Sequence, residues 1–141
     1  MQLFEQARGD DALLELLERG VRSIGAAEGS LMLLDGDSLR FTICASPAAA
    51  VLVGHAQPLS RGITSLVFTF QQPMIVNDVQ EDPRFDSTVD GLTGTPTRSI
   101  LVVPLVTPDE EFGVLSAINA AGPAGFTAAD LMRFSELGVE I

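Results

Sequence analysis

The spacing of apolar residues predicts helices near the beginning, the middle and the end of the chain. The first helix, expected over about 10–24, repeats apolar residues every three or four positions and has aspartates at its start that can cap it. A second helix is expected to follow Gly62 and to end before "QQP". A third opens with Thr127 and Asp130, whose T-x-x-D spacing is that of a capping box. The apolar faces comprise Leu13, Leu14, Leu17, Val21 and Ile24; Ile63, Leu66, Val67 and Phe70; and Leu131, Phe134, Leu137 and Ile141.

Other segments are shorter and have the patterns of β-strands. Leu39, Phe41 and Ile43 occupy alternate positions, which predicts a strand with one buried face. A D-G-D turn at 35–37 joins this strand to the preceding apolar run as a hairpin. "PMIV", "SILVVPLV" and "EFGVLSAINA" predict further strands, and the last two are apolar on both faces, like the covered centre of a sheet. The polar connection 77–98 follows "PMIV", and a connection this long is usually functional or carries a short helix.

The order of these elements predicts the fold class. Strands that come mostly as hairpins pair antiparallel, and helices must cover the faces of the resulting sheet, so we expect an α+β domain. A chain of 141 residues without repeats or an internal boundary has the size of one domain. The last helix reaches Ile141 without a Gly or Pro terminator, from which we expect a piece of a longer protein or a helix that ends in a dimer contact.

Charge and composition narrow the choice of partners. The net charge is -11, and the eight arginines are spread along a chain without lysine, so we expect neither nucleic acid nor a membrane as a partner. No apolar run approaches the roughly 18 residues of a membrane span, and the N-terminus lacks the basic region of a signal peptide. The single cysteine, Cys44, can form neither an internal disulfide nor a metal cluster, which favours a cytoplasmic location.

Several segments, in this order, resemble one family. The stretches "RGITSLVFTFQQPMIVNDVQEDPRF", "TRSILVVPLV" and "FGVLSAINAAGPAGFTAADL" resemble a GAF domain. That family typically shows G-I-x-x-x-V, D-V-x-x-D-P-R-F, R-S-x-L-x-V-P-L, G-V-L-x-x-x-N and F-T-x-x-D. The resemblance covers residues 12–141 and implies a single GAF-like domain over 1–141. Its implied fold is a PAS-related central antiparallel sheet of five to six strands flanked by helices.

The resemblance also implies a regulatory role. GAF domains mostly sense small molecules or mediate dimerisation inside larger signalling proteins, such as histidine kinases, cyclases, phosphodiesterases and transcription activators. We therefore expect a sensory domain of a bacterial-type signal-transduction protein that forms a homodimer through its terminal helices and acts on a covalently linked output domain. The alternative is a ligand-free dimerisation and relay module, whose pocket would be filled by Phe85, Phe126 or Met74.

The residues required by the cyclic nucleotide binders of the family are only partly present. Those members carry an N-K…F-x-x-x-D-E pattern, which Asn119, Phe126 and Asp130 match. Ala120 and Leu131 replace the lysine and the glutamate, so the family's Lys–Asp ion pair cannot form. Without that pair we expect Asn119 to bind loop backbone and Asp130 to cap its helix.

Other cofactor-binding and enzymatic subtypes also lack their residues. A covalent bilin needs a cysteine near the pocket helix, usually followed by His, whereas Cys44 lies on an early strand and precedes Ala45. Haem needs an axial histidine, and the only histidine, His55, lies in an expected surface loop. The methionine sulfoxide reductases of the family use several cysteines, and one thiol has no resolving partner in the chain. We therefore expect no cofactor, no metal and no enzymatic activity.

The remaining expectation is a non-covalent pocket between the sheet and the 77–98 connection. Arg98 is the cation expected at its mouth, where it would pair with a ligand carboxylate or phosphate, or else form a salt bridge to a neighbouring aspartate. The candidate ligand-binding residues are Ile63, Val67, Asn77, Phe85, Asp86, Asp90, Arg98, Ile100, Val102, Ala117 and Asn119.

Overall fold

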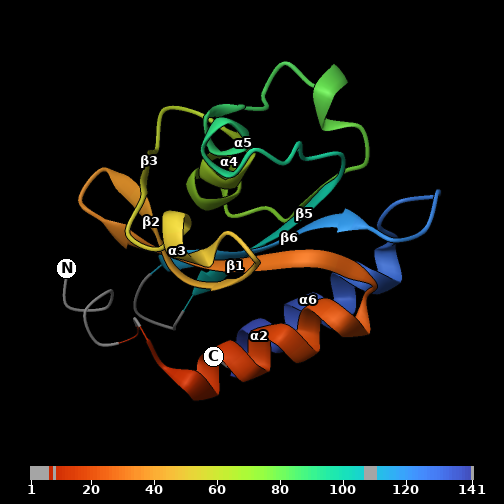
Figure 1. The fold of residues 1–141 in the computed structure, drawn as a ribbon, viewed down its shortest axis with the longest axis horizontal. Helices are drawn as coiled ribbons and strands as arrows, with labels where there is room; N and C mark the ends of the chain where they lie inside the picture. Colours follow the sequence, from red (N-terminus) through yellow and green to blue (C-terminus); the bar gives the residue numbers. More distant parts are fainter. Residues whose placement is uncertain (1–6, 8, 107–110, 141) are drawn as a thin grey trace.

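A computed structural model describes residues 7, 9–106 and 111–140 (Figure 1). The strands are β1 (Ala26–Asp35), β2 (Ser38–Ala45), β3 (Ala56–Pro58), β4 (Met74–Val76), β5 (Ile100–Val106) and β6 (Glu111–Ala120). The helices are α2 (Asp11–Ser23), α3 (Ala49–Leu52), α4 (Ile63–Phe70), α5 (Thr88–Thr93) and α6 (Ala128–Glu140), with a 3-10 helix η1 (Val79–Glu81). The end of the last predicted helix, Ile141, lies outside the described residues.

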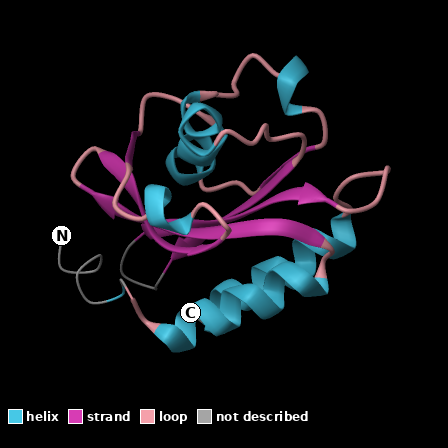
Figure 2. Cartoon of the chain, in the orientation of Figure 1, coloured by secondary structure: helices cyan, strands magenta, loops and turns pink. Residues whose placement is uncertain are grey.

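The strands form one antiparallel sheet in the order β3-β2-β1-β6-β5-β4. Helices α2 and α6 lie along one face, and α3, α4 and α5 lie on the other with the long connection (Figure 2). This confirms the predicted α+β class and the antiparallel sheet flanked by helices. The 77–98 connection carries η1 and α5, as its length suggested, whereas the short edge strand β3 was not predicted. No described helix has the length and apolar character needed to cross a membrane.

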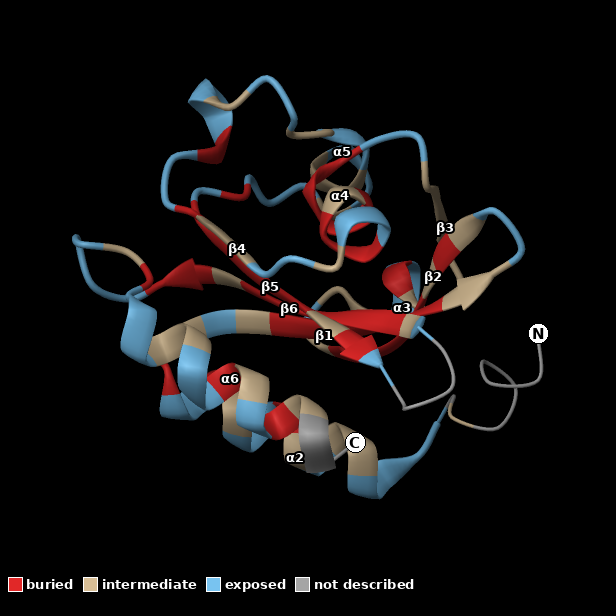
Figure 3. Ribbon diagram, turned by 180° about the vertical axis from the view of Figure 1, so that it is seen from behind, coloured by how far each residue is buried: buried red, intermediate tan, exposed pale blue. Residues whose placement is uncertain are grey.

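The sheet separates two apolar cores. The core on the α2/α6 face contains Leu17, Val21, Leu31, Leu115 and Phe134 among others. The core on the α4 face contains Met32, Phe41, Val67, Val102 and Val114 among others. Neighbouring residues of β1, β5 and β6 point alternately into the two cores, so these central strands are buried on both faces (Figure 3). The strands have continuous apolar sequences because both of their faces are covered, as the sequence pattern predicted.

Strand β2 differs from its prediction. Leu31 lies opposite Ile43 and Met32 lies opposite Phe41, which leaves Thr42 as the extra residue of a β-bulge. As a result Phe41 joins the core on the α4 face, and Ile43 joins the core on the α2/α6 face. The prediction of a single buried face was wrong, because a bulge inverts the alternation of side chains along the strand.

Helix α6 begins at the predicted capping box. The Thr127 N–H donates to Asp130 Oδ2 at 2.9 Å, and the Asp130 N–H donates to Thr127 Oγ1 at 3.2 Å. Asp130→Ala should lower the free energy of unfolding by about 1 kcal/mol, because it removes an acceptor from the exposed first turn. Urea denaturation would measure this. Asp130→Asn keeps an acceptor oxygen and should keep most of the stability, so equal losses in the two variants would contradict this role.

Candidate ligand-binding site

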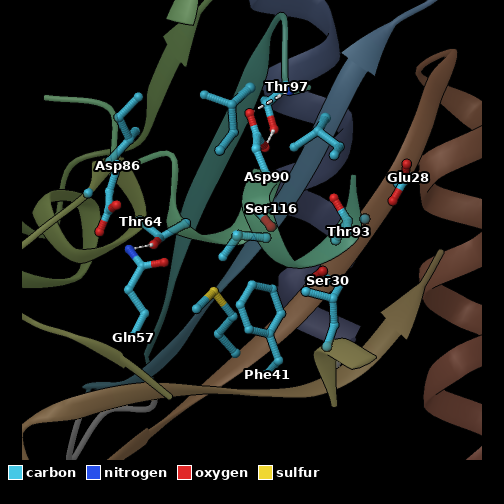
Figure 4. Close-up of a pocket in the computed structure, with 18 of the residues that line it drawn as sticks. Glu28, Ser30, Phe41, Gln57, Thr64, Asp86, Asp90, Thr93, Thr97 and Ser116 are labelled. Atoms are coloured by element: carbon cyan, nitrogen blue, oxygen red, sulfur yellow. Dashed lines mark hydrogen bonds between the residues drawn. The ribbon is translucent and has the colours of Figure 1, made fainter. Parts of the chain in front are cut away.

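A cavity of about 80 Å³ lies between the sheet and the layer formed by α3, α4 and α5 (Figure 4). Its apolar lining comes from Met32, Phe41, Leu52, Ile63, Phe85, Val89, Ile100 and Ile118. Its polar lining comes from Glu28, Ser30, Gln57, Thr64, Asp86, Asp90, Thr93, Thr95, Thr97 and Ser116, and backbone is exposed to it at Gly29 and Gly62. Pockets for drug-sized ligands usually measure about 300–1,000 Å³, so this cavity suits a much smaller molecule.

The floor of the cavity is formed by the centre of the sheet. Ser30 of β1 and Ser116 of β6 are direct register partners, and both belong to the cavity lining. Both are buried, with relative exposures of 7% for Ser30 and 6% for Ser116. The floor thus presents two neighbouring hydroxyl groups within an otherwise apolar sheet face.

Hydrogen bonds hold the opposite wall in place. Both carboxylate oxygens of Asp90 accept from Thr97, one from its N–H at 2.9 Å and one from its hydroxyl at 2.7 Å. These bonds tie α5 to the segment that enters β5. On the other side, Gln57 Nε2 donates to Thr64 Oγ1 at 3.1 Å and to the Arg61 carbonyl at 3.1 Å. Figure 4 shows Asp90 and Thr97 together on one side and Gln57 and Thr64 together on another.

Asp86 supplies a stabilised carboxylate at the cavity wall. Its Oδ1 accepts from the Thr88 hydroxyl at 2.7 Å and from the Thr88 N–H at 3.0 Å, and its Oδ2 lies 3.4 Å from Arg61 Nε. These hydrogen bonds, aided by the charges of Arg61 and His55, lower the pKa of Asp86 below its ordinary value of 3.8. The ionised carboxylate therefore stabilises the fold above that value, and the contribution is lost as the pH falls below it.

Thr88→Val should raise the pKa of Asp86 toward its ordinary value, because the largest stabilising hydrogen bond is removed while the backbone N–H remains. A carbon-13 NMR titration of the side-chain carboxyl groups would measure the change. Thr69→Val is the matched control, since Thr69 is an exposed residue of α4 and outside the cavity. A pKa of Asp86 that does not change in Thr88→Val would contradict this assignment.

Some of the predicted site residues line the cavity and others do not. The lining includes Ile63, Phe85, Asp86, Asp90 and Ile100. Val67 and Val102 are fully buried in the core on the α4 face and do not line it. Ala117 belongs to the opposite core, so its prediction was wrong. Strand alternation explains the error, because Ser116 and Ile118 point into the cavity and Ala117 must point away.

Arg98 is not at the cavity. Its side chain is exposed, and it forms no ion pair with any residue in the described part of the chain. The prediction of Arg98 as the cation at the mouth, or as the partner of a neighbouring aspartate, was therefore wrong. Arg61 is the arginine next to the cavity wall, paired with Asp86 and 58% exposed in its side chain. Arg61 follows the short edge strand β3, and the sequence pattern did not predict that strand.

Asn77 and Asn119 hold backbone and do not line the cavity. Asn77 donates to the Phe126 carbonyl at 3.1 Å and accepts from the Phe126 N–H at 2.8 Å. The Oδ1 atom of Asn119 accepts from the Arg98 N–H at 2.7 Å and the Ser99 N–H at 3.4 Å. The expected backbone role of Asn119 is thus confirmed, although its partners lie at the entrance to β5 and not in the loop that follows Asn119.

Two of the cavity residues that the sequence analysis missed are serines inside apolar strands. Ser30 lies in "EGSLMLLD" and Ser116 in "EFGVLSAINA". A serine inside a strand that is covered on both faces is a signal in itself, because a buried hydroxyl needs a partner. The pairing of β1 with β6 joins residues far apart in the sequence, so their meeting on one floor could not be predicted from local patterns.

The cysteine is buried, and the histidine is less exposed than the expected surface loop implied. Cys44 has a relative exposure of 6%, and burial raises the pKa of its thiol to about 11. His55 is half-buried, and its ring centroid lies 6.1 Å from that of Phe41. Within the described residues, no group of His, Cys, Asp and Glu side chains has the arrangement of a metal site.

Comparisons with known proteins match nearly the whole chain to a family model and about half of it to a curated relative. A family model described as a GAF domain matches residues 7–141. The alpha' subunit of the cone cGMP-specific 3',5'-cyclic phosphodiesterase of Mus musculus is 33% identical over 79 residues, which is 56% of this chain and 9% of that protein. The chain therefore spans only a small part of the length of this curated relative.

Solved structures share the fold. A methyl-accepting chemotaxis protein has a TM-score of 0.75 and 21% identity, with 97% of this chain and 88% of that chain covered. The GAF domain of a two-component sensor histidine kinase from Bacillus halodurans has a TM-score of 0.73 and 16% identity, with 96% and 92% covered. The GAF domain/HD domain protein from Geobacter sulfurreducens has a TM-score of 0.75 and 14% identity, with 97% and 92% covered.

Proposed function

The chain belongs to the GAF domain family, and from that membership we propose that it is a ligand-responsive regulatory domain of a larger signal-transduction protein. GAF domains act as sensory and regulatory modules, and the structural neighbours include GAF domains of a sensor histidine kinase and of an HD-domain protein. The observation that carries the ligand-binding part of this proposal is the cavity, because it combines an apolar lining with a few buried hydroxyl groups. That combination is typical of small-molecule sites.

The central sheet supports a route from this cavity to the helices on the other face. Gly29 lines the cavity, and a Cβ atom built on it would lie 2.4 Å from Val21 Cγ2 and 3.4 Å from Leu17 Cδ1 of α2. The backbone of β1 therefore separates the cavity from α2 without an intervening side chain. A ligand that moves this backbone changes the packing surface of α2 directly, which is the contact that a relay requires.

We propose that α2 and α6 form the output face. The two helices pack side by side on the sheet (Figure 1). A homodimer through these terminal helices would carry the signal to a covalently linked output domain. A location in the cytoplasm fits this arrangement.

A regulatory role without catalysis fits the chemistry of the described residues. The one thiol, on Cys44, is buried, and a pKa near 11 leaves little of the thiolate form that a nucleophile needs at neutral pH. Haem, bilin and cyclic nucleotide are not part of this proposal, since the described lining of the cavity contains neither a cysteine nor a histidine, and no basic residue.

Native mass spectrometry of the protein as expressed would test the proposal. A reproducible additional mass that is lost on denaturation would identify a co-purified ligand, and the dimer signal would report whether pairing depends on it. A bare monomer mass, with no binding of added metabolites, would contradict both the ligand and the dimer.

The second candidate is a ligand-free relay module, and the small size of the cavity favours it. Of the three residues expected to fill a collapsed pocket, Phe85 lines the cavity, Phe126 belongs to the opposite core and Met74 packs against the core on the α4 face. A relay module would give a clean dimer mass with no bound ligand, whereas a sensor would give the additional mass. The same experiment therefore separates the two functions.

A further inference from the structure

We propose that the cavity takes a small neutral or cationic ligand that binds the hydroxyl groups of Ser30 and Ser116, and that it rejects anions. This inference rests on the proposed ligand-responsive function and specifies the chemical class of the ligand. It combines three observations: a hydroxyl on the cavity floor that is open to the cavity and bonds to no described residue, a lining that contains carboxylates without a basic residue, and a volume of about 80 Å³.

Ser116 is the strongest indication of a ligand. Its relative exposure is 6%, it lines the cavity, and its hydroxyl forms no hydrogen bond with any residue that the structure describes. No side-chain nitrogen or oxygen of the described residues is both fully buried and without a partner, so the Ser116 oxygen is open to the cavity and not sealed in the core. The hydroxyl can both donate and accept, so a small polar molecule in the cavity would give Ser116 the partner that the chain does not supply.

Ser30 extends this polar patch to a second group. It lies opposite Ser116 across β1 and β6, and its hydroxyl contacts only the weak acceptor Cys44 Sγ, at 3.9 Å. The oxygen of Ser30 therefore remains available as an acceptor. Met32, Phe41 and Ile118 also line the cavity. Two adjacent hydroxyl groups within apolar walls favour a ligand with a compact polar head that can bind both.

The charge of the lining selects against anions. Glu28, Asp86 and Asp90 contribute carboxylates, and none of the described lining residues is Arg, Lys or His. Arg61 reaches Asp86 from the neighbouring open groove, where most of its side chain is exposed, so its charge offsets one carboxylate only. An anion entering the cavity would lose its hydration and find no opposite charge, whereas a cation or a neutral donor would meet acceptor oxygens.

Three small planar molecules of nearly equal shape test this selectivity: acetamidinium, acetamide and acetate, which are cationic, neutral and anionic. Each would be titrated into the nitrogen-15-labelled protein at constant ionic strength, with the backbone amide shifts as the readout. We expect acetamidinium and acetamide to shift the amides around Ser30 and Ser116, with acetate binding at least about tenfold more weakly, as expected for a site without a basic partner.

Single substitutions test the role of the hydroxyl groups. Ser116→Ala should weaken acetamide binding by about tenfold, because it removes one hydrogen bond from a buried site. The variant should fold normally, since the hydroxyl it removes has no partner among the described residues. Ser23→Ala is the matched control, because the Ser23 hydroxyl donates to the Gly20 carbonyl on α2 and is remote from the cavity lining. Ser30→Ala tests the second hydroxyl in the same way.

The outcomes separate this inference from the proposed function. If acetate binds as well as acetamidinium, the ligand class is wrong and the sensor function stands. If none of the three molecules shifts amides near the two serines, the hydroxyl pair is not a binding site. A co-purified ligand in native mass spectrometry would then still support a sensor, whereas a bare mass with no binding of added metabolites would overturn the ligand-responsive function as well. Equal acetamide affinity in Ser116→Ala and Ser23→Ala would also overturn the inference.

Discussion

Asn119→Ala should lower the free energy of unfolding by about 2–4 kcal/mol. The side chain is 6% exposed, and its Oδ1 is the acceptor for the N–H groups of Arg98 and Ser99 at the entrance to β5. Removing this acceptor leaves the buried Ser99 N–H and the partly buried Arg98 N–H without it, which costs about 1–3 kcal/mol. Asn119 also has φ +61°, a left-handed conformation that Asn tolerates and Ala resists by roughly 1–2 kcal/mol.

The two causes can be separated by a second variant. Asn119→Gly loses the same hydrogen bonds but accepts the left-handed backbone without strain, so it should be more stable than Asn119→Ala by about 1 kcal/mol. Urea denaturation measures both, and amide hydrogen exchange at Arg98 and Ser99 should become faster in each variant. Equal stability of the two variants would show that the backbone conformation contributes nothing. If both variants were as stable as the wild type, the hydrogen bonds from Arg98 and Ser99 to Asn119 would not stabilise the fold.

The fold was predictable because its signals are local. Helix α6 begins at a capping box that the T-x-x-D spacing identifies, and the central strands are apolar on both faces because each face packs against a core. The bulge at Thr42 was not predictable, since an alternating sequence fits a regular strand equally well. One extra residue was enough to transfer Ile43 to the other core.

The candidate site was predictable only in part, because it depends on which residues of each strand point toward the cavity. The connection that carries α5 contributes Phe85, Asp86 and Asp90 to the cavity, as the length and polarity of that connection suggested. On β6 the prediction chose Ala117, one residue away from Ser116, and a shift of one residue reverses the face of the sheet. The contribution of β1 was missed because its pairing with β6 is not encoded in either segment alone.

Gly29→Ala should destabilise the protein by about 1–3 kcal/mol, because it overpacks the contact between β1 and α2. The new Cβ would lie 2.4 Å from Val21 Cγ2 and 3.0 Å from the Ser116 carbonyl oxygen, and neither the branched side chain nor the backbone can move freely. Thermal or urea unfolding measures the loss. Gly91→Ala is the matched control, since nothing lies within 4 Å of the added atom, and it should be neutral or slightly stabilising.

A double-mutant cycle with Val21→Ala identifies the cause. Val21 is 5% exposed, so its truncation alone should be destabilising, but in the Gly29→Ala background it removes the clash and should cost less. Additive effects would mean that the strain in Gly29→Ala lies elsewhere, for example at the Ser116 carbonyl. A favourable coupling would mean that α2 responds to a change of one methyl group in β1. Since the backbone of Gly29 also lines the cavity, a ligand that shifts this backbone by a similar amount would act on α2 through the same contact.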